Sequence, residues 1–367
     1  MTMSSLQKTK KQDKTFTSEK APASFLLNRS RAFVVFCMIT AILLFSLSGC
    51  HSTEKKTTRS LFALDTYITI TLEGKDSEEA ANEAANYIME LERKLSRQDP
   101  GSEISSLNLS SKEMPVTLSK ETYDLLSMVV EYSNETEGRF DLTIAPVMDI
   151  WGFGTEDAHV PTQEEIAEVL PLVDYSKVHL LPDNKAYLEE GVKVDLGGAA
   201  KGYIGDLLME KLEGYKLSKI ILDLGGNICC GSSSSELNIG IISPLSSDQL
   251  CCTYSLPKGQ NCSVITSGAY ERNIEENGVR YGHIMDTSTG YPADTDLLSA
   301  TVIGPDGTKG DVYSTTLFSL GSEKAMELSS REGIDCILCM ENGTLWVSST
   351  LEGKVNAQEG WKIEYFS

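Results

Sequence analysis

The fold of this 367-residue sequence depends on one stretch, Val194-Asp195-Leu196-Gly197-Gly198-Ala199-Ala200-Lys201-Gly202-Tyr203-Ile204-Gly205-Asp206. The alternating segment 192–196 predicts a strand, the glycine pair predicts a tight turn, and 199–212 predicts a helix. Main-chain N–H groups at a helix start bind phosphate, glycine lets a ligand approach closely, and Lys201 adds a positive charge. The spacing fits neither a Walker loop nor a G-x-G-x-x-G motif. A phosphate site and a plain strand-to-helix turn are both open interpretations.

Strand-like and helical patterns alternate irregularly around this stretch. This predicts an α+β fold, with mixed and antiparallel sheets and packed helices, rather than a regular doubly wound sheet. Helical spacing predicts helices over 76–93, 119–133, 162–170, 309–320 and 322–331. Alternation and apolar runs predict strands over 62–72, 220–224, 237–242, 253–256, 262–266, 280–285 and 298–302, and a hairpin over 335–347.

The N-terminal segment has the pattern of a secretion signal. Positions 1–31 are polar and basic, 32–47 are apolar, and Leu47-Ser48-Gly49-Cys50 resembles a bacterial lipobox. In this interpretation residues 1–49 are a signal peptide, Cys50 is lipidated, 50–59 are a tether and 60–367 form the folded domain. A transmembrane anchor is the alternative, since the apolar run approaches the length that spans a bilayer. Both interpretations place the folded part at the extracytoplasmic face of the cell membrane.

The chain is strongly acidic, with a formal net charge of −21. The leader is basic, so the rest of the chain is more acidic still. Such a surface repels nucleic acid, whose binding needs basic patches. It also repels anionic lipid, and membrane attachment must therefore come from acyl chains rather than from electrostatics.

The cysteines do not form a disulfide framework. There are nine in a long chain, and Cys336 and Cys339 have the spacing of a redox or metal motif. However, they fall in the predicted hairpin 335–347, where positions i and i+3 point to opposite faces of a strand. We therefore expect buried, apolar thiols.

Two further segments combine residues suited to catalysis and ligand binding. In 138–154, Asp141 beside Phe140 can bond to a flavin or adenine edge, or can cap a helix next to a buried Trp151. The other segment comprises 266–272 and 281–292. There His283 ends a predicted strand amid hydroxyl groups, three residues before Asp286, which favours an acid–base role over a structural one.

The last segment is Gly310-Asp311-Val312-Tyr313-Ser314-Thr315. Asp311 and Thr315 are four residues apart and share one face of a helix. Carboxylate and hydroxyl oxygens suit Mg²⁺, which completes its shell with phosphates and water. The alternative is an Asp favoured at a helix start by the helix dipole.

Together the four segments resemble the ApbE family, the FAD:protein FMN transferases, from about Phe62 to Gly321. The most specific parts are 195–206, Thr266-Ser-Gly-x-Tyr-Glu-Arg272, His283-Ile-x-Asp-x-x-Thr-Gly290 and 311–315. The resemblance implies an ApbE-like fold with two closely joined lobes around the flavin site. It also implies transfer of the FMN moiety of FAD to a Thr or Ser hydroxyl of a target flavoprotein, with release of AMP.

The resemblance also implies roles for individual residues. It assigns FAD contacts to Leu64, Gln98, Arg139, Phe140, Asp141, Asp195, Lys201 and Met285, and Mg²⁺ ligands to Gly198 (through its carbonyl), Asp311 and Thr315. We take His283 as the candidate general base and Asp286 as its orienter or substitute. One departure is Gln98, because many relatives carry an aromatic residue there that can stack on the flavin ring.

Two other functions remain open at this stage. An FAD pyrophosphatase needs the same metal and phosphate site with water as the acceptor, and a non-catalytic flavin-binding lipoprotein needs no metal at a pyrophosphate. The expected partners are FAD and flavoproteins of membrane or extracytosolic electron transfer.

Overall fold

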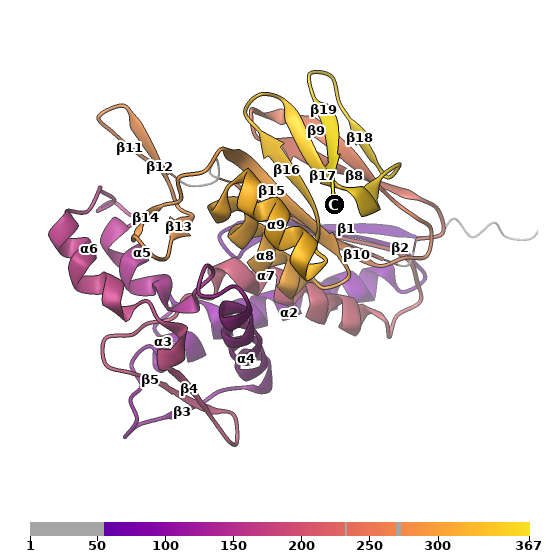
Figure 1. Ribbon diagram of the computed structural model, residues 1–367. Helices are drawn as coiled ribbons and strands as arrows, with labels where there is room; N and C mark the ends of the chain where they lie inside the picture. Colours follow the sequence, from indigo (N-terminus) through magenta and orange to yellow (C-terminus); the bar gives the residue numbers. More distant parts are fainter. Residues whose placement is uncertain (1–54, 232, 269–272) are drawn as a thin grey trace, which may run out of the picture. The chain divides into compact units, whose positions relative to one another are not determined.

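The structure, a computed structural model, describes residues 55–231, 233–268 and 273–367. Its centre is a nine-stranded sheet (Figure 1), whose strands in spatial order are β1 (Lys56–Ala63), β2 (Thr66–Gly74), β6 (Leu217–Asp223), β7 (Asn227–Gly231), β10 (Cys262–Gly268), β15 (Leu297–Gly304), β16 (Asp335–Met340), β17 (Thr344–Ser348) and β19 (Lys362–Phe366). Neighbouring strands are antiparallel except β17 and β19, which are parallel.

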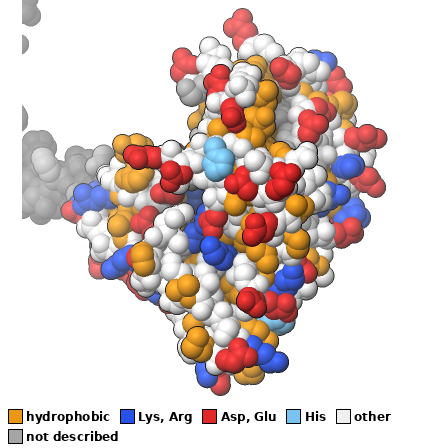
Figure 2. Space-filling view, turned by 90° about the vertical axis from the view of Figure 1, so that its left-hand side faces the viewer, with side chains coloured by type: hydrophobic (Ala, Val, Ile, Leu, Met, Phe, Trp, Pro, Cys, Tyr) orange, Lys and Arg blue, Asp and Glu red, His pale blue; other side chains and the backbone are white. Residues whose placement is uncertain are grey.

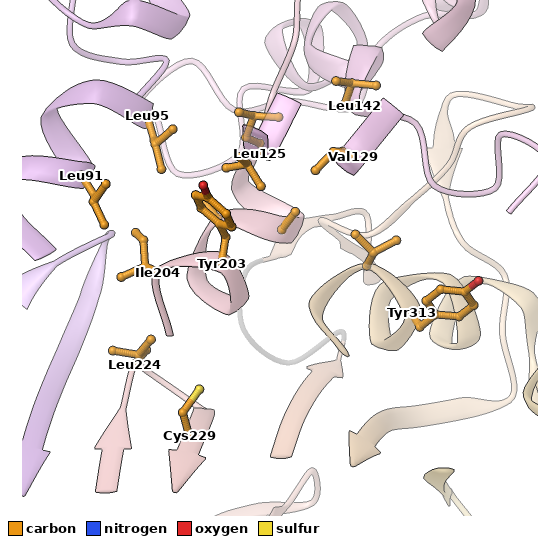
Figure 3. Packing of buried hydrophobic residues seen from close by; sticks show 14 of the residues in the cluster. Leu91, Leu95, Leu125, Val129, Leu142, Tyr203, Ile204, Leu224, Cys229 and Tyr313 are labelled. Atoms are coloured by element: carbon orange, nitrogen blue, oxygen red, sulfur yellow. The ribbon is translucent and has the colours of Figure 1, made fainter. Parts of the chain in front are cut away.

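The larger core lies between one face of this sheet and a layer of helices. The helices are α2 (Ser77–Leu95), α4 (Lys120–Glu135), α7 (Gly197–Leu212), α8 (Gly307–Leu320) and α9 (Ser322–Glu332). Figure 3 shows Tyr203 and Ile204 of α7 among the side chains of α2 and α4. Helix α7 is buried on most of its surface, so its position is fixed from several sides.

A second core lies on the other face of the sheet, against a small sheet of β18 (Val355–Ala357), β9 (Ser246–Leu256) and β8 (Leu237–Ser243). Strand β16 contributes to both cores, because successive side chains point to opposite faces. Cys336 lies in the helical core and Cys339 in the second core. All seven cysteines in the described ranges are buried and free, as predicted.

Shorter elements surround one end of the sheet. They are α3 (Glu103–Leu107), β3 (Val116–Thr117), η1 (Leu142–Ile144), α5 (Ala145–Trp151), α6 (Gln163–Val169), η2 (Leu170–Leu172), η3 (Tyr175–Lys177), β4 (Val178–Leu181), β5 (Lys185–Leu188), β11 (Asn273–Glu276), β12 (Val279–Gly282), β13 (Met285–Asp286) and β14 (Tyr291–Pro292), with η4 (Ser349–Leu351) near the C-terminus. A third, smaller core joins α5 to β13 around Trp151. The ribbon of β11 and β12 projects from the body in Figure 1.

The predicted α+β fold is confirmed, but the strand predicted over 192–196 is wrong. This segment pairs with no strand in the part of the chain described. Instead, the Asn108 side chain donates to the Val194 carbonyl at 3.1 Å and accepts from its N–H at 2.7 Å. The Asp195 N–H donates to the Leu142 carbonyl at 2.8 Å. Alternation of apolar and charged residues resembles a strand even when side chains satisfy the main chain of the segment.

The strand predicted over 62–72 is a hairpin, not one strand. Leu64 and Asp65 form its turn, with φ of 53° and 58°. Because neither is glycine or asparagine, the sequence carries no turn signal there. Lys56–Arg59, predicted as tether, already belongs to β1. The strand predicted over 280–285 is likewise two strands, β12 and β13.

The leader 1–49 and Cys50 lie outside the described residues, as do positions 269–272 of the motif 266–272. Within the described ranges, no helix combines the length and the apolar character that crossing a bilayer requires.

Helices α7 and α8 approach each other through glycine. A Cβ added to Gly202 would lie 2.0 Å from the Gly307 carbonyl oxygen, which is main chain and cannot move aside. At the same contact, the Gly202 N–H donates to Asp311 Oδ2 at 2.9 Å. The separation of the two helices therefore depends on the absence of a side chain at Gly202.

We expect Gly202→Ala to lower the free energy of unfolding by at least about 2–3 kcal/mol, because the methyl group forces α7 and α8 apart. Gly214→Ala is the matched control, since its Cβ would meet no atom closer than 3.7 Å. Urea denaturation of both variants measures the difference. Equal stability of the two variants would contradict the close contact.

Candidate active site

A cavity of about 370 Å³ opens where α7, α8, the end of α2 and the β1–β2 turn meet. Its lining includes all residues that the sequence assigned to FAD or to Mg²⁺, namely Leu64, Gln98, Arg139, Phe140, Asp141, Asp195, Gly198, Lys201, Met285, Asp311 and Thr315, together with His283. These residues are far apart in the sequence. The structure therefore brings the predicted ligand site together in one place.

The start of α7 forms one wall of the cavity. Asp195 Oδ1 accepts from the Gly197 N–H at 2.8 Å, and Gly198 and Lys201 follow in the first turn and a half. A Cβ on Gly198 would lie 2.9 Å from the Phe140 ring, so only glycine lets Phe140 pack there. The glycine pair forms the first residues of α7 rather than a turn before it, and the helix start that the sequence predicted faces the cavity.

Asp311 and Thr315 of α8 form the facing wall. Asp311 is only 4% exposed. Its Oδ2 accepts from the Gly202 N–H, and its Oδ1 accepts from Asn227 Nδ2 at 3.0 Å. Thr315 Oγ1 lies 3.1 Å from the hydroxyl of Ser267, which also lines the cavity. Asp311 has no ion-pair partner among the residues the structure describes, so a buried carboxylate is held here by neutral donors alone.

A second carboxylate, that of Asp206, fixes the start of α8. Asp206 of α7 accepts from the N–H groups of Gly307 and Thr308 at 2.7 and 2.8 Å and from the Thr308 hydroxyl at 2.6 Å. These donors belong to the first turn of α8, where main-chain N–H groups lack partners within the helix. Burial raises the pKa of Asp206 to about 6, although all three hydrogen bonds favour its ionised form.

In the segment 138–154, Asp141 caps a helix and Trp151 is buried, which is the structural alternative given for this segment. Asp141 accepts from the N–H and hydroxyl of Thr143, at 2.8 and 2.6 Å, and from the Tyr175 N–H at 2.9 Å. It thus caps η1 while it lines the cavity. Trp151 is fully buried, and its indole N–H donates to the Gly290 carbonyl at 2.9 Å.

His283 and Asp286 differ in position. His283 follows β12 and lines the cavity. Asp286 is not part of the lining, and its Oδ1 accepts from the Ser288 N–H and hydroxyl at 2.8 and 2.5 Å. The structure therefore brings His283, and not Asp286, to the cavity wall.

Sequence reasoning missed the contribution of the end of α2. Glu92 and Arg97 line the cavity. Glu92 accepts from the Leu64 N–H at 2.7 Å and so holds the left-handed turn of the hairpin. Arg97 pairs with Asp149 and Asp195. Helical periodicity predicts α2, but it carries no signal for partners so far along the chain.

Charges of both signs meet in the cavity. Its lining holds the carboxylates of Asp65, Glu92, Asp141, Asp195 and Asp311 and the cationic groups of Arg97, Arg139 and Lys201. Negative groups outnumber positive ones. On the face shown in Figure 2, Lys and Arg side chains near the centre are surrounded by Asp and Glu side chains. A multiply charged anion needs further positive charge to bind in such a cavity.

Comparison with known proteins identifies the family. A sequence model of the ApbE family matches residues 64–338. The FAD:protein FMN transferase of Treponema pallidum (strain Nichols) is 30% identical over 295 residues, which cover 75% of this chain and 81% of that protein. The enzyme of the same name from Klebsiella pneumoniae (strain 342) is 35% identical over 251 residues, 68% of this chain and 78% of that protein.

Solved structures show the same fold. The crystal structure of the ApbE protein from Thermotoga maritima matches with a TM-score of 0.75 at 29% identity, over 82% of this chain and 99% of that chain. The apo form of the Pseudomonas stutzeri flavinyl transferase ApbE matches with a TM-score of 0.68 at 22% identity, over 84% and 96%. These likenesses define the class, an α+β protein of the ApbE fold.

The family match goes further than the fold: this chain belongs to the ApbE family. The resemblance predicted from the four motifs is thereby confirmed.

The raised pKa of Asp206 has a consequence for stability. Its folded pKa of about 6 exceeds the ordinary value of 3.8, so the folded state binds more protons between these pH values. The contribution of Asp206 to stability is therefore full at low pH and is lost as the pH rises through 6. Relative to Asp206→Asn, we expect the wild type to lose about 1–3 kcal/mol of unfolding free energy between pH 4 and pH 7.

Urea denaturation over this pH range measures the difference. Asp124→Asn, at a half-exposed position of α4 where the carboxylate pairs with Lys120, controls for the loss of one negative charge. The lost hydrogen bonds of Asp206→Asn add an offset that does not depend on pH. A constant difference, or one that grows in the opposite direction, contradicts the burial argument.

Proposed function

We propose that this ApbE-family chain is an FAD:protein FMN transferase. It transfers the FMN moiety of FAD to a Thr or Ser hydroxyl of a target flavoprotein and releases AMP. The observation that carries the proposal is the single cavity lined by the residues that the motifs assigned to FAD and Mg²⁺. The names of the curated relatives, which are FAD:protein FMN transferases, support it.

A divalent cation fits the wall formed by α8. Asp311 and Thr315 line it with hard oxygen atoms, and a Cβ on Gly198 would lie 4.0 Å from Thr315 Oγ1, so these residues are close together. A carboxylate accepts about four hydrogen bonds, and Asp311 accepts two, so it retains lone pairs for a metal. No cluster of three or more His, Cys, Asp or Glu side chains suits a metal within the described ranges, which leaves this mixed oxygen set.

We therefore assign Mg²⁺ to Gly198, Asp311 and Thr315. Mg²⁺ commonly uses one or two carboxylates, with substrate phosphates and water as its other ligands. When bound, it supplies the positive charge that neutralises the pyrophosphate of FAD and the charge that develops on the leaving AMP.

The start of α7 is suited to the phosphates of FAD. Its N–H groups and dipole favour an anion, and Lys201 adds a full charge within the first turns. Neither Lys201 nor Arg139 has an ion-pair partner in the part of the chain described, so both are available to a phosphate. Phe140 and Met285 provide buried apolar surface in the same cavity for a ring system.

The transfer step is a phosphoryl transfer. The acceptor oxygen forms a bond to the FMN-side phosphorus, the bond from that phosphorus to the bridging oxygen breaks, and AMP leaves with its electron pair. We assign the role of general base, which takes the proton of the acceptor hydroxyl, to His283, and its position in the cavity lining supports this. Asp286 acts on the turn that follows His283, through its bonds to Ser288, rather than on the substrate.

We further propose that the protein is a lipoprotein, with its lipid anchor at Cys50 on the extracytoplasmic face of the cell membrane. The lipobox-like Leu47-Ser48-Gly49-Cys50 after a basic and apolar leader supports this. The acceptors are then flavoproteins of membrane or extracytosolic electron transfer.

One assay tests the reaction. The purified protein is mixed with FAD, Mg²⁺ and a candidate acceptor flavoprotein. Acceptor labelling is read from in-gel flavin fluorescence, and free FMN and AMP are read by chromatography. We expect labelled acceptor and one AMP for each label. Free FMN with AMP and no label would identify a pyrophosphatase, and FAD binding without turnover would identify a binding protein.

We expect Asp311→Asn to reduce Mg²⁺-dependent transfer at least about 100-fold, because it removes the only charged ligand of the metal site. Glu352→Ala, in a short turn near the C-terminus, is the control and should retain full activity. Thermal denaturation shows whether each variant is folded. Undiminished transfer by a folded Asp311→Asn protein would remove the metal assignment.

A further inference from the structure

We propose that Arg97 is a positioning residue that neutralises Asp195 at the start of α7, so that the diphosphate of a flavin dinucleotide can bind there. The proposal rests on the proposed function. It adds a reason why the diphosphate can bind next to the carboxylate of Asp195.

Arg97 lies just after the end of α2 and joins two other parts of the cavity wall. Its Nε forms an ion pair with Asp195 Oδ2 at 2.7 Å, and its Nη1 donates to Asp149 Oδ1 at 2.6 Å. The side chain is only 19% exposed. Burial opposes the charge of the guanidinium, but the two carboxylates raise the pKa of Arg97 above its ordinary value. It is therefore a charged group held on two sides.

Asp195 occupies a position that a phosphate would also favour. Its Oδ1 accepts from the Gly197 N–H, the first N–H of α7, and both residues line the cavity. A carboxylate is stable at a helix start for the same reason as a phosphate, through the N–H groups and the dipole. However, an unpaired carboxylate there repels an incoming diphosphate. The ion pair with Arg97 removes this repulsion while Asp195 keeps its hydrogen bond.

The second contact of Arg97 fixes its position. Asp149 of α5 also pairs with Lys193 at 2.9 Å, so one carboxylate is shared by two cationic groups. The segment 192–196 has no strand partner among the described residues, and its position depends on side-chain bonds such as those of Asn108. The link from α5 through Arg97 adds a rigid attachment for Asp195.

Two of the three guanidinium nitrogens of Arg97, Nε and Nη1, face protein carboxylates. Arg139 and Lys201, by contrast, have no ion pair within the described residues. Loss of Arg97 should therefore act through the charge it leaves on Asp195. This separates a positioning role from direct binding and from a general effect on folding.

The test measures binding of two probes by isothermal titration at fixed Mg²⁺ concentration. ADP carries the diphosphate, and riboflavin carries the flavin ring without phosphate. We expect Arg97→Gln to weaken ADP binding about tenfold or more and to change riboflavin binding less than about twofold, because an uncompensated charge affects only the anion. Arg93→Gln, the same substitution on the exposed side of α2, should leave both affinities unchanged.

Two further variants separate charge from packing. Arg97→Lys keeps the positive charge and should retain most of the ADP affinity. The double variant Arg97→Gln/Asp195→Asn removes both charges and should bind ADP more tightly than Arg97→Gln alone. In the transfer assay, Arg97→Gln should raise the KM for FAD with little change in kcat.

Equal weakening of ADP and riboflavin by Arg97→Gln would overturn the proposal, as would a double variant that recovers no ADP affinity. If Arg97→Gln does not fold, the ADP affinities of Arg97→Lys and of the double variant decide. Loss of ADP affinity in both variants would overturn the proposal. Failure of the proposed function is read separately, from the wild type in the transfer assay, where no acceptor flavoprotein would be labelled. If the wild type binds FAD and ADP, and Arg97→Gln has the same ADP affinity as Arg93→Gln, only the role of Arg97 is refuted.

Discussion

Helices α7 and α8 each supply a carboxylate that binds the main chain of the other, and the cavity depends on this exchange. Asp206 of α7 accepts from the first N–H groups of α8, and Asp311 of α8 accepts from the Gly202 N–H of α7. The exchange is possible only because Gly202 and Gly307 let the two backbones touch. The cavity-lining residues of α7 and of α8 are thereby held on facing walls at a fixed separation. A small shift between the helices would move the two walls together or apart.

The two carboxylates have different surroundings, and the difference decides their roles. Asp206 accepts three hydrogen bonds from one helix end, which uses most of its capacity and makes it a structural group. Asp311 accepts only two, from Gly202 and Asn227, and faces the cavity. A buried carboxylate without a cationic partner is costly unless a charge of opposite sign is supplied. Within the proposed function, the metal ion supplies that charge to Asp311 when FAD binds.

Local patterns predicted most helices and many strands, because their signals lie within a few residues. The alternation in β16, which sends Cys336 and Cys339 into different cores, is one example. Prediction failed where side chains from distant parts of the chain form the main-chain hydrogen bonds of a segment. The segment 192–196 resembles a strand, but Asn108 takes the place of the neighbouring strand. The turn at Leu64 is held by Glu92 of α2 and has no glycine to mark it. Motif resemblance placed the residues around Asp195 and Asp311, but not Arg97, whose role exists only through its distant partners.

The departure at Gln98 is best understood from the whole cavity wall. Gln98 is exposed at the rim, and an amide there offers little surface for stacking. Aromatic surface enters the cavity instead from Phe140, which packs on Gly198, and from Phe153, which stacks on buried Trp151 with ring centroids 5.5 Å apart. Both rings are held by rigid neighbours, so they offer a preorganised apolar surface, which a rim side chain does not. Phe140 and Phe153 therefore give the cavity aromatic surface that does not depend on position 98.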